Sequence, residues 1–304
     1  MKRLLLTCAA AVLLLSAFDK KKKAKVKLPE EYIYIPAGTF TDFEPGEEPD
    51  YNKRVSMPSF YMSKYEISNL QYRNFFNEVV PGLATEEIKK IICDSSGWNN
   101  RPLSYGEPMI KYYYNHPTYN NYPVVNISID GATKYCEWLQ QKIQKDNPEF
   151  TIEIKIPSKQ QWIWAAMGGR SRAIFPWGNY YLRNKKGEPM CNFRRVDDGA
   201  IYRNRTTGKA EVADRYSHND YAGSLSDRFF YTTTVKSFYP NDFGLYNMCG
   251  NAAEMVSERD ICVGGSWNDY GGDVHIRSYT TFGTSAPTVG FRPIIIVKEK
   301  STNK

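Results

Sequence analysis

The sequence has few of the residues on which stapled or metal-dependent small proteins rely. Its 304 residues include 6 cysteines, none in a CxxC pair, and only 3 histidines, which lie far apart at His116, His218 and His275. These numbers exclude a disulfide-dense scaffold and a local zinc motif such as HExxH. The chain also lacks the GxSxG, P-loop and GxGxxG signatures, so the common hydrolase and nucleotide-binding motifs are missing.

The composition indicates a folded chain with a sizeable core. Hydrophobic residues make up 41% and charged residues 24%, which excludes collagen-like and mainly disordered chains. The net charge of +7 is concentrated near the start, where residues 1–28 hold eight Lys or Arg against one Asp. The remainder is close to neutral and does not resemble a nucleic-acid groove, so no nucleic-acid partner is expected.

The N-terminus has the pattern of an export signal. A basic start is followed by an apolar run from Leu4 to Ala17 and then by lysines, which is typical of a secretory leader. A run of about 14 residues is short for a helix that crosses a bilayer core of about 30 Å. We interpret residues 1–18 as a signal peptide or N-terminal anchor and 19–30 as a basic linker. We expect export to the periplasm or outer cell envelope, with membrane contact only through this N-terminal segment.

The cysteines give no disulfide framework. If the leader is removed, five remain, and an odd number with no regular spacing does not define a pairing. We expect most of them to be small buried residues, although one pair would be able to form in an oxidising compartment. They are Cys93, Cys136, Cys191, Cys249 and Cys262.

Residues 31–297 are expected to form one domain, followed by a polar tail at 298–304, because no internal linker interrupts them. From 170 to 290 helical periodicity disappears and Gly, Asn, Asp and Tyr dominate, which predicts a loop-rich half. The periodicity and the capping residues predict the regular elements. Strands are expected at 32–36, 123–129 and 152–156, and helices at 68–78, 130–145 and 158–166.

Short motifs run along the body in a fixed order. They are Tyr34–Phe40, Glu66–Asn69, Tyr122–Ser128, Ile156–Ser158, Phe175–Gly178, Phe243–Met248, Gly250-Asn251, Gly264–Trp267 and Gly290–Arg292. Each is weak alone, but their order resembles the sulfatase-modifying-factor family, to which formylglycine-generating enzyme belongs. The resemblance implies an α+β fold, poor in regular structure and related to C-type lectins.

The resemblance also implies where catalysis would occur. In the family, two cysteines after the Gly-Gly-Ser-Trp-like segment bind copper and activate oxygen, which oxidises a cysteine of a client sulfatase. This chemistry needs a pair of soft, redox-active ligands. Counting from Ser266, the two positions hold Asp269 and Val274, and Cys262 lies upstream of the motif. We therefore expect no bound copper, no catalytic residues and no formylglycine-generating activity.

The alternative is that the residues around Asp269 belong to the active site of an enzyme with a different chemistry. Asp269, Asp273 and His275 combine carboxylates with an imidazole, and such a set is able to perform acid-base chemistry. The simpler interpretation is that they belong to a polar turn around Gly271-Gly272.

Two structural calcium sites are implied by the family resemblance. Alternating side-chain and main-chain oxygens suit Ca²⁺, which takes 6 to 8 oxygen ligands at about 2.3–2.6 Å. The alternative is that these residues only form turns and cap a helix. The first set is Asn247, Gly250, Ala252 and Glu254, and the second is Asn192, Phe193, Asp227 and Phe229.

These features together predict an exported, calcium-stabilised and non-catalytic member that binds or assembles in the cell envelope. The stretch of His116-Pro117 and Asn121–Val125 resembles the inactive domains of gliding-motility and type IX secretion lipoproteins. We expect a protein partner in the envelope, with a glycan as the other partner class. The alternative function is a formylglycine-generating oxidase or another enzyme on the same scaffold.

Overall fold

The computed structural model describes residues 25–43, 49–50, 53–99, 106–195, 201–212 and 231–300. The expected leader, the start of the basic linker and the last four residues lie outside these ranges. Within the ranges, no helix combines the length and the apolar character needed to cross a bilayer.

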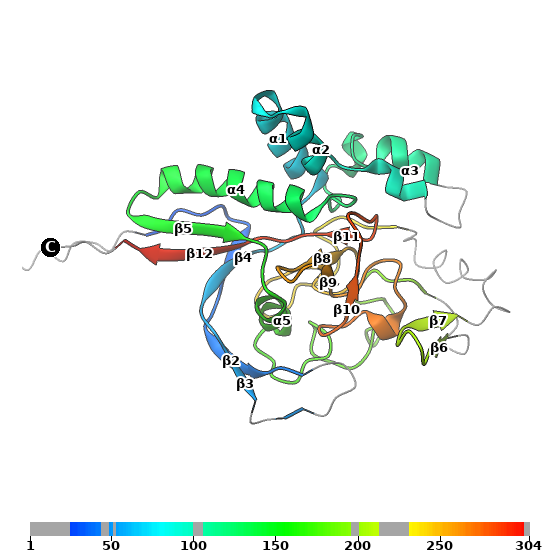
Figure 1. The fold of residues 1–304 in the computed structure, drawn as a ribbon. Coiled ribbons are helices and arrows are strands. Elements are labelled where there is room, and N and C mark those ends of the chain that lie inside the picture. The colour runs from blue at the N-terminus through cyan, green and yellow to red at the C-terminus, as the bar shows by residue number, and fades with distance from the viewer. Residues whose placement is uncertain are drawn as a thin grey trace, which may run out of the picture.

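A four-stranded antiparallel sheet organises the first half of the domain (Figure 1). Its strands, in spatial order, are β1 (Tyr32–Ile35), β4 (Phe60–Ser63), β12 (Ile294–Glu299) and β5 (Phe150–Lys155). The C-terminal strand β12 therefore lies between β4 and β5, which ties the end of the chain to its beginning. It continues to Glu299, two residues past the expected end of the domain at residue 297.

Helix α4 (Ile129–Asp146) covers one face of this sheet (Figure 1). Its buried side chains, including Ala132 and Tyr135, pack in one core cluster with Ile152 and Ile154 of β5. The other helices are α1 (Asn69–Val79), α2 (Thr85–Ile91), α3 (Gly106–Tyr112) and α5 (Lys159–Met167), with 3₁₀ turns η1 (Val80–Gly82), η2 (Ser95–Asn99), η3 (Pro117–Tyr119) and η6 (Gly271–Asp273).

The helix boundaries follow the expected capping residues. Ser68 and Ser158 each form a capping box with a glutamine three residues later, at the start of α1 and α5. Gly168 ends α5 in the left-handed conformation with φ 58°, which glycine adopts without steric cost.

The second half is loop-rich, as predicted, and between residues 170 and 290 the described residues contain no α-helix. A second sheet has the order β10-β9-β8-β11, and two hairpins stand apart from it. Their strands are β8 (Ala253–Met255), β9 (Ile261–Val263), β10 (Tyr279–Thr281), β11 (Val289–Gly290), and the pairs β2 (Gly38–Thr41) with β3 (Arg54–Met57) and β6 (Ile201–Arg203) with β7 (Ala210–Val212).

The expected strand at 123–129 is wrong. This segment makes one isolated bridge, between Ser68 and Pro123, and Val124 N donates to Ile67 O. Asn126 then takes φ 58°, which ends the extended run, and Ile129 already belongs to α4. Val124, Val125 and Ile127 are 0% exposed and pack in the core clusters, so the hydrophobicity of the segment indicates burial and not strand pairing.

The described part of the basic linker packs on the domain. The Asn147 side chain accepts a hydrogen bond from Lys27 N at 2.7 Å and donates to Lys27 O at 2.9 Å. Val26 and Leu28 pack against the core cluster beneath α4. The chain therefore becomes part of the folded domain before residue 31.

Replacing Asn147 with alanine tests this attachment. Asn147 is 1% exposed, so Asn147→Ala leaves buried backbone groups unpaired and should lower the free energy of unfolding by about 1–3 kcal/mol. Urea denaturation measures this, with the exposed Gln141→Ala on the same helix as a control expected to stay within about 0.5 kcal/mol of the parent. Equal effects of the two changes would contradict a specific clamp.

Candidate functional site

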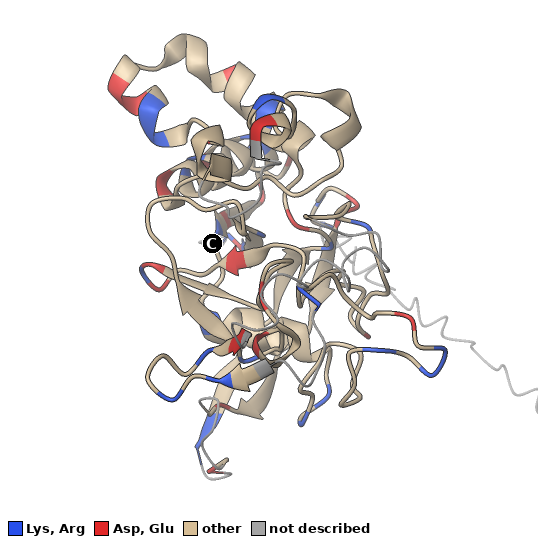
Figure 2. Ribbon diagram, turned by 90° about the vertical axis from the view of Figure 1, so that its right-hand side faces the viewer, with Lys and Arg blue, Asp and Glu red and all other residues tan. Residues whose placement is uncertain are grey.

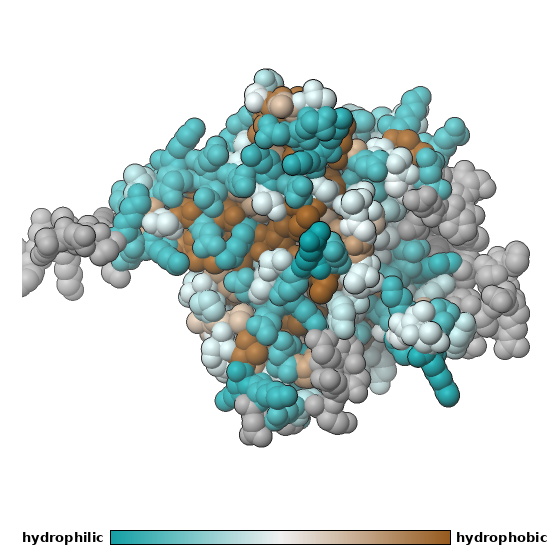
Figure 3. All heavy atoms as spheres, in the orientation of Figure 1, coloured by the Kyte–Doolittle hydropathy of each residue, from teal (hydrophilic) through white to brown (hydrophobic). Residues whose placement is uncertain are grey.

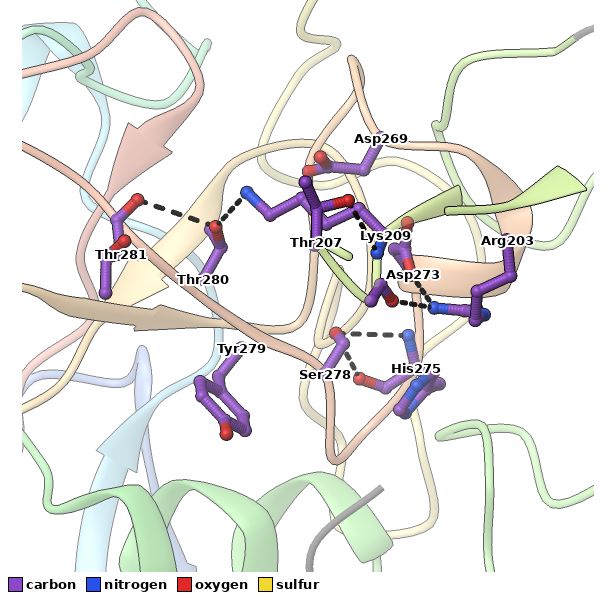
Figure 4. Close-up of a pocket in the computed structure, with 12 residues that line it drawn as sticks. Arg203, Thr207, Lys209, Asp269, Asp273, His275, Ser278, Tyr279, Thr280 and Thr281 are labelled. Atoms are coloured by element: carbon purple, nitrogen blue, oxygen red, sulfur yellow. Dashed lines mark hydrogen bonds and ion pairs between the residues drawn. The ribbon is translucent and has the colours of Figure 1, made fainter. Parts of the chain in front are cut away.

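A polar cavity of about 420 Å³ opens between the second sheet and the β6–β7 hairpin (Figure 4). One wall is the edge strand β10, another is the loop that joins β6 to β7, and the segment after β9 supplies the rest. The side chains that line it are Arg203, Thr207, Lys209, Asp269, Asp273, His275, Ser278, Tyr279, Thr280 and Thr281.

The two positions that the family resemblance assigns to catalytic cysteines lie in different environments. Asp269 lines the cavity, and its Oδ2 accepts hydrogen bonds from Ser266 N at 2.8 Å and Ser266 Oγ at 2.6 Å. Val274 is 0% exposed and packs in the core cluster around α5. One position therefore presents a carboxyl group and the other fills the hydrophobic interior.

The thiol nearest this region in the chain is inert. Cys262, on β9, is fully buried, and its Sγ contacts Thr280 O at 3.6 Å. Burial, with a further contribution from Asp269, raises the pKa of Cys262 to about 12. It is therefore protonated at neutral pH, whereas a metal ligand or nucleophile needs the thiolate. All five cysteines in the described ranges are unpaired thiols, and only Cys93 is less than fully buried.

The alternative acid-base residues meet in the cavity but are engaged elsewhere (Figure 4). Asp273 pairs with Arg203 at 3.0 Å and also accepts from Ala210 N. His275 Nδ1 accepts from the backbone N of Arg277, and the Ser278 hydroxyl donates to His275 O and not to its ring. The site therefore contains no serine-histidine dyad.

Burial sets the charge of the cavity. It raises the pKa of Asp269, with Asp273 adding to the effect and the Ser266 hydrogen bonds opposing it. Burial also lowers the pKa of His275, so its imidazole is neutral at pH 7. The Lys209 ammonium donates to Thr280 Oγ1 at 2.8 Å. Hydrogen-bond donors and acceptors of mixed charge thus line the cavity, and Figure 2 shows both signs of charge on this side of the molecule.

The first expected calcium loop lies beside a buried ion pair. Glu254 binds Arg292 at 2.7 Å, with both side chains at most 1% exposed, and Trp162 Nε1 donates to Glu254 Oε2 at 2.7 Å. Both carboxylate oxygens of Glu254 therefore already accept hydrogen bonds. The Asn247 amide donates to Thr234 O, to Val235 O and to the carboxylate of Glu66.

Glu66 supplies a second carboxylate beside this loop, and the calcium sites expected from the sequence did not include it. It is fully buried and accepts hydrogen bonds from Asn247 Nδ2 at 3.0 Å, from Asn251 Nδ2 and from Ala252 N. Burial raises the pKa of Glu66 to about 8, although Arg292 lowers it. Arg292 donates to Glu254, whereas the described partners of Glu66 are the amide groups of Asn247, Asn251 and Ala252, so a cation beside Glu66 would favour its ionised form.

The second expected calcium set is only partly described. Asn192 Nδ2 donates to Tyr231 O at 2.6 Å, and Asn192 O accepts from Asn251 N, so this residue lies against the first loop. Phe193, next to it, packs at the edge of the core cluster around α5. Asp227 and Phe229 lie outside the described residues. In the parts of the chain that the structure covers, no group of three or more His, Cys, Asp or Glu side chains is arranged to hold a metal.

Comparison with known proteins shows that most of the chain matches one protein family. A family model for the sulfatase-modifying factor enzyme 1-like domain matches residues 17–297. Mouse formylglycine-generating enzyme is 26% identical over 287 residues, which cover 85% of this chain and 63% of the mouse protein. The Thermomonospora curvata formylglycine-generating enzyme is 24% identical, covering 79% and 75% of the two chains. The chain thus spans less than two thirds of its mouse relative.

Inactive relatives and solved structures also match. Bovine inactive C-alpha-formylglycine-generating enzyme 2 is 23% identical over 78% of this chain and 76% of its own length. PvdO from Pseudomonas aeruginosa has a TM-score of 0.53 at 18% identity, covering 87% and 93% of the two chains. CarF has a TM-score of 0.51 at 16% identity, covering 88% and 98%. The two structures support the α+β fold, and their low identity carries no functional argument.

The raised pKa of Asp269 predicts a pH-dependent effect of Asp269→Asn. The stability that a carboxyl with a raised folded pKa contributes is present below its unfolded pKa of about 3.9 and is lost as the pH rises through the folded pKa. Asparagine keeps an oxygen for Ser266 and does not titrate. Relative to the parent, Asp269→Asn should therefore gain stability between pH 4 and pH 7.

Urea midpoints of both proteins at several pH values measure this difference. Asp146→Asn, at an exposed carboxyl, is the control and should follow the parent. Parallel pH profiles for the parent and Asp269→Asn would show that the buried carboxyl is not perturbed.

Proposed function

Since the chain belongs to the sulfatase-modifying factor enzyme 1-like family, we propose that it is an exported, non-catalytic member that binds a protein partner in the cell envelope. The single observation that carries the proposal is which side chains occupy the two expected copper-ligand positions and where these side chains lie. Asp269 lines the cavity with a carboxyl group, and the hydrocarbon side chain of Val274 is buried. The export signal in the sequence supports the location.

Copper chemistry has no suitable ligand pair here. The family resemblance implies that copper is held by two thiolates, which are soft ligands that favour Cu(I). Cys262 is buried and protonated, and its carbonyl contact with β10 holds the thiol within the sheet. The cavity keeps its polar lining while the redox ligands are replaced, which suits binding and not oxidation.

The open edge of β10 favours a polypeptide as the bound partner. Gly264 N donates to Ser278 O, and Phe282 N donates to Asp260 O, so these alternate positions face β9. In an antiparallel pair the intervening residues, Tyr279 and Thr281, direct their main-chain groups away from β9. Both residues are exposed and line the cavity, so an extended segment would be able to add to this edge.

Calcium is proposed as a structural ion at the loop of residues 247–254. The Asn247 side chain and the main chain of Gly250 and Ala252 would supply oxygens, with Glu66 or Glu254 as the carboxylate. Glu66 is a buried carboxyl whose pKa is raised to about 8, and a bound cation would favour its ionised form as a ligand. The ion would connect loops that contain little regular structure, and it would have no catalytic role.

The absence of oxidase activity is tested directly. Purified protein with a sulfatase-motif peptide, copper and oxygen should give no formylglycine product by mass spectrometry, because no thiolate pair is present. The Thermomonospora curvata enzyme serves as the positive control. A product that this chain forms and that Cys262→Ala abolishes would overturn the non-catalytic assignment.

Calcium removal is tested by thermal unfolding. If the ion binds only the folded protein, a chelator should lower the melting temperature, since ligand at about 100 times its Kd contributes about 2.7 kcal/mol. The calcium-dependent part of the shift should vanish in Asn247→Ala. It should persist in Asn241→Ala, a buried asparagine that bonds to Ala165 O and Ala166 O outside this loop.

Each variant is compared with itself in chelator and in calcium, so a general loss of stability does not affect the result. An unchanged melting temperature in chelator, together with no metal on elemental analysis, would remove the calcium proposal. The binding proposal would be unaffected by that outcome.

A further inference from the structure

Both ends of the described chain meet at the C-terminal end of α4. Lys27 is held there by Asn147, which follows the helix directly. At the other end of the chain, Lys300 N donates to Glu149 O at 3.1 Å and its Nζ donates to Pro148 O at 2.8 Å. Figure 1 shows β12 ending beside the junction of α4 and β5.

This meeting point carries an excess of lysine, and we call it the terminal face. All of its charged residues are exposed, and the left end of the molecule in Figure 3 is hydrophilic. The face consists of Lys25, Lys27, Lys145, Lys298 and Lys300 together with the acidic residues Asp146, Glu149 and Glu299.

The sequence outside the described residues adds charge next to this face. Lys20 to Lys23 precede Lys25 by a few residues, and the apolar run from Leu4 to Ala17 comes before them. Four lysines thus precede, within seven positions of the sequence, the Lys27 that Asn147 holds at the terminal face.

We propose that the terminal face docks on a bilayer that contains anionic phospholipid. Lysines near an anionic membrane surface each contribute about 1 kcal/mol, and the effect falls off within a Debye length. The folded domain itself, and not only the N-terminal segment, then contacts the membrane. In Figure 1 the strands of the cavity, β6, β7 and β10, lie toward the other end of the molecule from β12's free end, so docking leaves the cavity accessible.

Vesicle binding of the purified full chain tests the proposal. The vesicles are phosphatidylcholine alone or phosphatidylcholine mixed with phosphatidylglycerol, and the readout is the ratio of the two affinities. An apolar N-terminal segment binds both kinds of vesicle, so the ratio isolates the electrostatic part. The parent should prefer the anionic vesicles, and the preference should disappear at high salt.

Replacing all five lysines of the terminal face with glutamine should reduce the ratio by at least about tenfold. Replacing them with arginine keeps the charge and should keep the ratio, which separates charge from folding. The matched control changes five exposed lysines on other elements to glutamine and should retain most of the preference. These are Lys53, Lys90, Lys185, Lys186 and Lys236.

Three results would overturn the proposal. The first is a parent protein with no preference for anionic vesicles. The second is an equal loss in the control, which would indicate net charge alone. The third is a loss caused by Lys20–Lys23→Gln with none from the five-lysine variant, which would assign binding to the N-terminal segment and exclude the folded face.

Discussion

The buried pair of Arg292 and Glu254 holds the two halves of this domain together. Arg292 is fully buried, and besides Glu254 its guanidinium donates to Ser63 O and Lys64 O at the end of β4 and to Tyr246 O. Glu254 lies on β8, in the second sheet, and also accepts from Trp162 of α5. One guanidinium therefore connects the first sheet, the second sheet and a loop between them. Removing either partner would leave a buried charge at a cost of about 3–5 kcal/mol, so the fold depends on both.

The loop-rich half is held by side chains that replace missing secondary structure. Asn241 donates to the last carbonyls of α5, and its own oxygen accepts from Phe243 N and Leu245 N. Asn247 and Asn251 take positive φ values and direct their amides to Glu66. Asparagine tolerates this backbone conformation better than most residues, and its amide satisfies buried acceptors. Glu66 thus joins the start of α1 to the loop that precedes β8, and its buried carboxyl is the reason a cation is proposed there.

Local signals in the sequence predicted what local physics determines. The caps Ser68 and Ser158 and the stop at Gly168 placed α1 and α5 to within about a residue, and alternation in 152–156 located β5. The alternation of apolar and polar residues did not predict the strands of two or three residues in the second sheet, because tertiary pairing determines such strands. The family motif directed attention to Asp269, which lines the cavity, but Arg203 and Lys209 reach the same cavity from a hairpin about sixty residues earlier. No sequence period connects those two segments.

Asp269 and Val274, the two positions that the family resemblance assigns to the copper ligands, have different places in this structure. Val274 fills space in the core beside α5, so hydrocarbon there adds to the packing that holds the cavity wall. Asp269 is anchored by Ser266 and cannot supply a soft ligand, yet it preserves the shape and polarity of the cavity. Arg203 and Asp273 then fix the hairpin against the opposite wall. In the proposed function, this polar cavity serves recognition, through donors and acceptors that lie beside an open strand edge.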